Sequence, residues 1–413
     1  EHNTTVKNVN KRAERSRGAG DCLDSQWILH FGNQIMRMLP GGLDVIGCYV
    51  IGEKSALAMV QSIVYQSIKL LYRQAIKMTF NCLPTASQHP LIISVEAPLS
   101  KLSFAHVTLA DNGALVTSTV EKATYQDNQW VSVENRVALD YRLSFEEKLA
   151  HMDFQSLFCE CFRPIALSVA SADCTINGTF RDENDQLVAK NKKKSKHVPE
   201  SALKLLEVDF YTRPVFQKEP ATRPSTVSGS LLIKGTVLCR AAVPGRARVG
   251  DALMAIKTDF LRNLYARGQL HHEGMQVVEG EEDDRSAIHQ FPRRVLLPFP
   301  TQNNNNLYFS DYLFEGDTVE DALESFIEIL GLQTEAKEIQ DEWEKIPTEE
   351  DLISFEIKLP LLETPKESSK SASRLQKQEE KQRQLLLKWP MIYTILAFWI
   401  GLLSYIIYLL LAG

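Results

Sequence analysis

Apolar and polar residues follow two recurring patterns along the chain, one typical of helices and one typical of strands. After Gly52, apolar residues return every three or four positions, which predicts an amphipathic helix over about 55–78. The same spacing predicts a second helix from about Asp251 to Ala266. Short runs rich in Val, Ile and Leu predict strands at Leu43–Ile51, Leu91–Val95, Phe104–Leu109, Ala114–Val120, Ser230–Ala242 and Phe291–Phe299.

Residues typical of turns and helix caps separate these segments. Asn112-Gly113 supplies the positive φ angles of a tight turn and predicts a hairpin between the strands on either side. Asp317 is expected to cap a third helix, with Glu320 in the reciprocal N3 position and Gly331 at its end. This order of strands and helices predicts an α+β fold built of α/β units. Two tandem strand–helix–strand units also suggest an internal repeat.

Shifts in polarity divide the chain into six expected segments. We expect a disordered start at 1–20, a first α/β unit at 21–180, a polar linker at 181–228, a second α/β unit at 229–363, a basic stalk at 364–388 and a transmembrane helix at 389–411.

The 23 residues from Trp389 to Leu411 contain no charged side chain. As a helix at about 1.5 Å per residue they would span roughly 34 Å, enough for a hydrocarbon core of about 30 Å. Pro390 suits the helix entrance, and the aromatic rings of Trp389 and Tyr393 suit the membrane interface. With Trp399 further along, these residues form the candidate membrane anchor.

The charges beside this segment predict its orientation. Residues 366–388 carry seven basic residues against three acidic ones, and no charge follows the segment. The positive-inside rule then places the bulk of the chain in the cytosol and the C-terminus in the lumen. The first twenty residues contain no apolar core of a signal peptide. We therefore expect a single-pass protein with reduced thiols, anchored in membrane lipid by its tail.

The composition changes this picture little. With 413 residues, 44% of them hydrophobic, and a formal net charge of −6, the chain is neither collagenous, nor disordered throughout, nor a small disulfide scaffold. Its mild acidity argues against nucleic acid as a partner, because nucleic-acid-binding domains carry basic patches.

The search for catalytic chemistry finds no constellation. The chain has no phosphate-binding loop, no dinucleotide fingerprint and no nucleophile elbow, so we expect no enzyme, no cofactor and no metal. Cys159, Cys161 and Cys174 lack a fourth metal ligand at a suitable spacing, and idle thiols on a strand are the expected alternative. A cysteine hydrolase that pairs Cys159 or Cys161 with His151 stays open as the enzymatic alternative.

Four features resemble one known family, the odorant-response-abnormal (type four) tail-anchored membrane proteins of animals. One is the C-terminal anchor, and the other three are the strings Arg37-Met38-Leu39-Pro40-Gly41-Gly42-Leu43 with Val45–Ile51, Phe291-Pro292-Arg293-Arg294 with Val295–Pro298, and Asp311–Phe314. The resemblance covers most of residues 20–413. The opening strand of the family is missing before residue 20, so the first unit is expected to be incomplete.

The resemblance implies a non-catalytic adaptor of the endoplasmic reticulum membrane. Such proteins promote folding and trafficking of seven-helix receptors, including odorant receptors, and recruit the cysteine protease specific for the ubiquitin-fold modifier. A receptor chaperone that acts without the protease is the alternative. The resemblance also implies a degenerate MPN-like cytosolic region, in which Val50 and Gly52 stand where a metalloprotease would have zinc-binding imidazoles.

The strings that carry the resemblance also supply the candidate partner-binding or structural residues. These are Arg37, Met38, Leu39, Pro40, Gly41, Gly42, Leu43, Pro292, Arg293 and Arg294. Gly41 and Gly42 are expected to serve backbone conformation rather than contact. Arg293 and Arg294 are expected to bind acidic groups, either of a partner or of the acidic stretch Glu279–Asp284.

Overall fold

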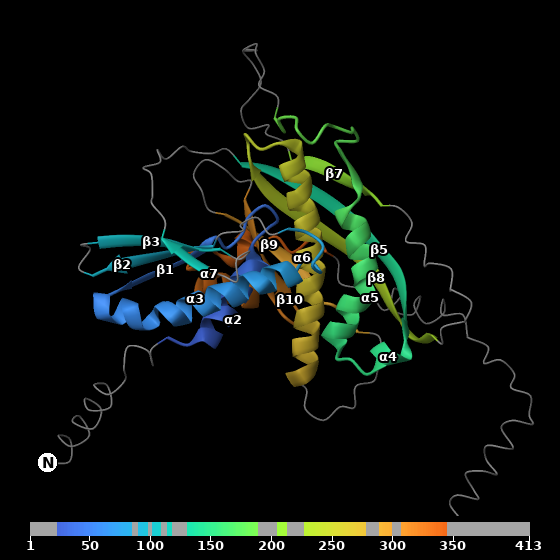
Figure 1. Ribbon diagram of the computed structural model, residues 1–413. Coiled ribbons are helices and arrows are strands. Elements are labelled where there is room, and N and C mark those ends of the chain that lie inside the picture. The colour runs from blue at the N-terminus through green and yellow to red at the C-terminus, as the bar shows by residue number, and fades with distance from the viewer. Residues whose placement is uncertain are drawn as a thin grey trace, which may run out of the picture. The chain divides into compact units, whose positions relative to one another are not determined.

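The computed structural model describes residues 23–84, 90–97, 101–108, 114–117, 130–188, 205–212, 227–277, 289–299 and 307–344 (Figure 1). These residues form helices and mixed sheets, which confirms the predicted α+β class. The expected disordered start, stalk and membrane anchor, with Trp389, Pro390, Tyr393, Trp399 and Leu411, lie outside these ranges. Within the ranges, no helix is long and apolar enough to cross a bilayer.

The first sheet is built around one amphipathic helix. Its strands, in hydrogen-bonded order, are β1 (Gly47–Gly52), β2 (Leu91–Glu96), β3 (Lys101–Thr108) and β4 (Ala114–Thr117). β1 and β2 are parallel, so the chain must cross over between them, and α3 (Lys54–Lys77) is in this crossover. α3 confirms the predicted helix: its apolar side chains Val64 and Ile68 cluster with Ile92 and Cys48 of the sheet. The antiparallel β3–β4 pair flanks the predicted Asn112-Gly113 turn, whose own residues are outside the described ranges.

An additional helix, α2 (Ser25–Met38), lies beside α3 and was not predicted. The Asp24 side chain caps it by accepting a hydrogen bond from the Gln26 amide at 2.8 Å. Gly32 permits the close approach of the two helices, because a Cβ there would lie 2.6 Å from the Leu71 side chain.

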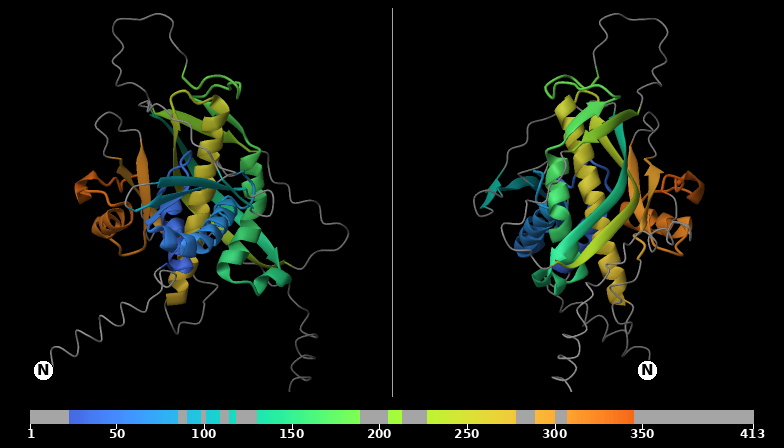
Figure 2. Two further views of the ribbon diagram at one scale, coloured as in Figure 1. Left: turned by 60° about the vertical axis from the view of Figure 1, so that its left-hand side comes forward. Right: turned by 90° about the vertical axis from the view of Figure 1, so that its right-hand side faces the viewer.

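The largest sheet is dominated by two long antiparallel strands, β5 (Trp130–Glu146) and β8 (Val227–Pro244), which pair along nearly their whole length. The strand order is β6–β7–β5–β8, with β6 (Asp173–Ile176) and β7 (Leu206–Tyr211) on the other side of β5. Two helices, α5 (Phe154–Ala170) and α6 (Val249–Val277), contact this sheet and each other (Figure 2). The short helix α4 (Glu147–Ala150) follows β5.

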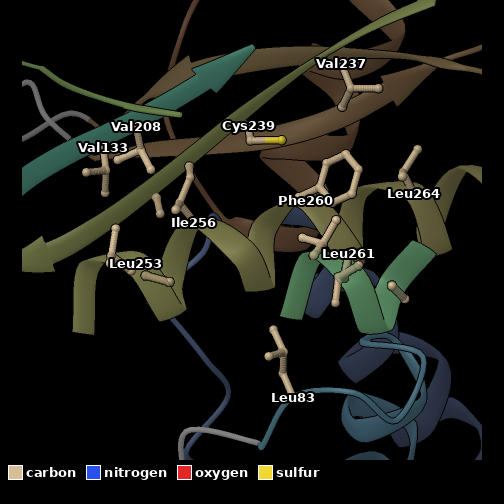
Figure 3. Close-up of a cluster of buried hydrophobic side chains, with 14 of the residues drawn as sticks. Leu83, Val133, Val208, Val237, Cys239, Leu253, Ile256, Phe260, Leu261 and Leu264 are labelled. Carbon is tan, nitrogen blue, oxygen red and sulfur yellow. The ribbon is translucent and has the colours of Figure 1, made fainter. Parts of the chain in front are cut away.

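The main hydrophobic core fills the space between this sheet and its helices. Val133, Val208 and Val237 of the strands are buried with Ile256, Phe260, Leu261 and Leu264 of α6 (Figure 3). Phe260, Leu261 and Leu264 have no exposed surface. α6 is therefore the central helix of the fold, and any polar residue on it between the core positions must find partners inside the protein.

A smaller layer follows at the end of the described chain. β9 (Arg293–Pro298) and β10 (Tyr308–Leu313) form an antiparallel pair covered by α7 (Val319–Leu330) and a short 3₁₀ turn (Ala336–Glu338). Its own core contains Leu297, Leu313 and Phe326, and Met38 at the end of α2 joins it.

The sheet pairing differs from the expected organisation in two ways. β5 from the expected first unit pairs with β8 from the expected second unit, and residues Glu1–Ile346 form one compact unit. The polar stretch 181–228, expected to be a linker, also contributes β7 to this sheet. The repeat prediction is wrong, because β1 and β2 pair with each other whereas β8 and β9 lie in different sheets.

The third predicted helix is present but begins one residue later than expected. Thr318, not Asp317, is the N-cap, and Asp321, not Glu320, closes the capping box. Gly331 ends the helix in the left-handed conformation at φ 64°, as predicted. The shift arises because the Asp317 carboxylate instead accepts a hydrogen bond from the Phe314 amide at 2.8 Å.

Candidate functional site: a buried charge cluster

The two strings Arg37–Leu43 and Phe291–Pro298, far apart in the sequence, meet at a cluster of buried charges. We call Asp259, Arg267, Arg294 and Glu344 the charge cluster. All four residues are at most 6% exposed. Two come from α6, one from β9 and one from the end of the described chain.

Asp259 is the centre of this cluster and accepts four hydrogen bonds. The guanidinium of Arg294 donates two of them, at 2.7 and 3.1 Å. The backbone amides of Gly41 and Arg240 donate the other two, each at 2.9 Å. The carboxylate thus ties the Arg37–Leu43 string to β8 and β9 at once, and charge-assisted bonds of this kind are the strong ones.

Arg294 extends the connection to α2. Its guanidinium also donates to the Ser310 hydroxyl at 3.0 Å. That hydroxyl lies 3.3 Å from the Arg37 carbonyl oxygen, to which it donates. Burial is the largest single influence and would lower the pKa of Arg294, but the charge and hydrogen bonds of Asp259, together with Tyr312 and Cys239, outweigh it and the pKa is raised. Arg294 is therefore a permanently charged cross-link whose two terminal nitrogens are hydrogen-bonded, while its buried Nε has no hydrogen-bond partner among the described residues.

Arg267 and Glu344 form the second pair of the cluster. The Arg267 guanidinium donates to Glu344 Oε1 at 2.7 Å and to the Pro292 carbonyl at 2.7 Å. Glu344 in turn accepts from the backbone amides of Arg294 at 2.8 Å and of Leu238 at 3.1 Å. Glu344, the last described residue, thus links β9 to β8 and α6 through hydrogen bonds.

Gly41 and Gly42 are required by the close approach of the backbone. A Cβ on Gly41 would lie 2.1 Å from the Ala255 carbonyl oxygen, and one on Gly42 would lie 2.2 Å from that of Ala242. Gly42 also has φ +83°, in the region that favours glycine. Their role in the fold is therefore conformational.

The structure gives the two candidate arginines different partners from those expected. The Arg294 side chain is 3% exposed and forms an ion pair with Asp259, so its guanidinium is not available at the surface to bind a partner. Arg293 lies 3.5 Å from the Asp341 carboxylate, which is 41% exposed. Arg37 lies 3.4 Å from Glu273 on α6. The acidic stretch Glu279–Asp284 is outside the described ranges.

The remaining candidates are also placed. Pro40 and Met38 are buried, Leu39 and Leu43 are half-buried, and the Leu43 carbonyl accepts a hydrogen bond from Arg262 at 3.2 Å. Together these contacts make the Arg37–Leu43 string part of the internal framework. Sequence reasoning missed Asp259 and Glu344, and the one available signal was that the carboxylate of Asp259 directly precedes the apolar core residues Phe260 and Leu261 of α6.

The described thiols are poorly suited to nucleophilic chemistry. Burial raises the pKa of Cys48 to about 11 and that of Cys159 to about 12, and it also raises the pKa of Cys161 and Cys174. Nucleophilic cysteines have lowered pKa values instead. Cys159 and Cys161 lie on α5, a helix rather than the strand expected.

No group of three or more His, Cys, Asp or Glu side chains in the described ranges could hold a metal ion. Val50 and Gly52, at the positions compared with zinc-binding imidazoles, lie in β1. Val50 is half-buried against the apolar face of α3, where a valine serves packing.

Comparison with known proteins places this framework in a family. The model of the ODR4-like family, described as odorant response abnormal 4-like, matches residues 1–341. The chain belongs to the ODR4-like family. The match includes every described helix and strand and contains Asp259 and Arg294, while Glu344 lies just beyond its end.

Named ODR4-like relatives extend along most of the chain. Odorant response abnormal protein 4 of Caenorhabditis elegans is 26% identical over 347 residues, which are 82% of this chain and 70% of that protein. The human protein odr-4 homolog is 24% identical over 78% of this chain and 72% of its own length. The Drosophila melanogaster homolog is 19% identical over 83% and 76%.

Proposed function

We propose that this chain is a non-catalytic, tail-anchored adaptor of the endoplasmic reticulum membrane that promotes folding and trafficking of seven-helix receptors. The observation that carries the proposal is the ODR4-like match over residues 1–341. The nematode relative is named for an abnormal odorant response, and odorant receptors are seven-helix clients of the kind proposed.

The proposed anchor is the uncharged segment 389–411. A tether of this kind raises the local concentration of a cytosolic unit beside membrane clients without any new contact. The proposed enzyme partner is the cysteine protease specific for the ubiquitin-fold modifier, which this chain would hold at the membrane. The raised pKa values of the described thiols support an adaptor rather than an enzyme. A degenerate MPN-like origin of the fold is part of the same proposal.

The test uses cells that lack this chain and express a tagged seven-helix receptor. Full-length chain is expected to restore receptor at the cell surface, as is a version whose residues 389–411 are replaced by an unrelated tail anchor of the endoplasmic reticulum. A version that ends at Lys388 is expected to fail and to leave the protease in the cytosolic fraction. Full rescue by that truncated version would refute the requirement for anchoring.

Two further measurements separate the alternatives. A covalent adduct between Cys159 or Cys161 and a thiol-reactive probe made from the ubiquitin-fold modifier would establish the hydrolase instead. A variant that no longer binds the protease but still restores receptor delivery would establish a direct receptor chaperone.

A further inference from the structure

One face of α3 is exposed along most of the helix. Its residues follow one another at intervals of three or four, which places them in a single line. We call this line the α3 stripe: Met59, Ser62, Gln66, Leu70, Arg73 and Lys77. Met59 and Leu70 are 52% and 42% exposed, so apolar side chains lie between the polar ones.

The charge of this helix has a single sign. From Lys54 through Val95 the sequence has no Asp or Glu, although the chain as a whole has a formal charge of −6. α3 itself carries Lys54, Lys69, Arg73 and Lys77. Lys54, Arg73 and Lys77 are exposed. An acidic protein has therefore gathered cations on one surface helix.

Helix stability does not explain this placement. A cation in the last turn is favourable, and Lys77 is in that turn. Arg73, however, lies before the last turn of α3, and the effect of the helix dipole is confined to the first and last turns. Lys54, at the start of the helix beside the N-cap residue Glu53, is not on the stripe. The pattern fits a ligand with negative charge better than it fits the needs of the helix.

We propose that the α3 stripe docks on the anionic headgroups of the membrane that holds the chain. This inference rests on the proposed anchor, because only the 44 residues 345–388 separate the described chain from segment 389–411. The tether keeps the stripe close to the bilayer, so a weak contact is sufficient. Arg73 and Lys77 would contact the phosphate and carboxylate groups of anionic lipids. Met59 and Leu70, on the same line, would enter the apolar side of the membrane interface.

Full-length chain in lipid nanodiscs provides the test. One disc contains phosphatidylcholine alone, and the other contains phosphatidylcholine with phosphatidylserine. Brief acetylation followed by mass spectrometry measures the reactivity of each lysine. Lys77, on the stripe, is expected to react more slowly in the anionic disc than in the neutral one. Lys148 and Lys337, whose side chains are 72% and 73% exposed on other elements, are the controls and should react equally in both.

A charge reversal on the stripe isolates the contact. Each cation near an anionic surface changes affinity about fivefold. Arg73→Glu removes one cation and adds one anion, so it should weaken docking about 25-fold and abolish the protection of Lys77. Arg142→Glu, an exposed position on β5, makes the same change in net charge and should leave the protection intact.

Each outcome decides the proposal. Equal acetylation of Lys77 in both discs overturns it, as does an equal loss of protection in the two charge-reversal variants. If the chain separates from the discs on gel filtration, the anchor proposal fails. The stripe is then tested by adding the same full-length chain to a large excess of anionic vesicles, which replaces the local concentration that the tether would supply, and absence of Lys77 protection there overturns the proposal.

Discussion

Replacing Asp259 by Asn is the sharpest test of the charge cluster, because the change keeps the shape of the side chain and removes its charge. The native carboxylate accepts four hydrogen bonds through two oxygens. The amide keeps one oxygen, so two donors would face an NH₂ group. Charge-assisted bonds contribute about 1.5–3 kcal/mol each, and losing two costs about 3–6 kcal/mol. Removing one partner of a buried ion pair costs about 3–5 kcal/mol, which agrees.

Urea unfolding of the full-length chain in mild detergent, followed by tryptophan fluorescence, measures this cost. Asp341→Asn is the matched control, since it makes the same chemical change beside Arg293 at a carboxylate that is 41% exposed. It should cost less than about 1 kcal/mol. The double variant Asp259→Leu with Arg294→Met should lose less stability than the two single changes together, because neither charge is left alone. Strict additivity, or equal losses for Asp259→Asn and Asp341→Asn, would refute the assigned role.

Three further predictions follow from local geometry. Gly41→Ala should prevent accumulation of folded chain in a soluble-expression assay, because its Cβ would lie 2.1 Å from a carbonyl oxygen of α6, whereas Gly52→Ala, with no atom nearer than 3.7 Å, should fold normally. Iodoacetamide should label Cys159 slowly at pH 7.5 and much faster above pH 11, since burial raises its pKa to about 12, and fast labelling at neutral pH would contradict that environment. Hydrogen bonds from Thr318 lower the pKa of Asp321 below 3.8, so its stabilisation is present above pH 3.8 and disappears as the pH falls through the folded-state pKa. The melting temperature of Asp321→Asn should therefore lie below that of the native chain at pH 6, with the gap closing toward pH 2.

Local patterns in the sequence identify the elements whose shape depends on neighbours along the chain. The apolar spacing after Gly52 predicts α3 to within one residue at each end. The strand at Ser230–Ala242 is present as the centre of β8. Gly331 ends α7 because only its own backbone angle is involved.

The features that the sequence did not predict either depend on residues far away in the chain or contain residues that usually argue against the element. Pro164 lies inside α5, and the helix tolerates it within a core that buries Phe158 and Phe162. The sequence of β5 shows little alternation of apolar and polar residues in its first half, because that half of the strand is buried on both faces. The charge cluster joins residues 259, 267, 294 and 344 and binds the backbone of Gly41, and nothing local distinguishes Arg294 from the neighbouring Arg293.

The charge cluster and its backbone partner Gly41 come from distant parts of the sequence, so the ribosome makes them at very different times. Gly41 leaves the ribosome long before its partner Asp259, and Glu344 follows Gly41 by 344 − 41 = 303 residues. At about 5–20 residues per second, the ribosome needs about 15–60 s to complete the set. Until Arg294 is made, the carboxylate of Asp259 has no guanidinium to neutralise it, and until Glu344 is made, Arg267 lacks its carboxylate partner. A protein proposed to assist the folding of receptors is thus itself a late-folding chain, which needs protection from aggregation while it is made.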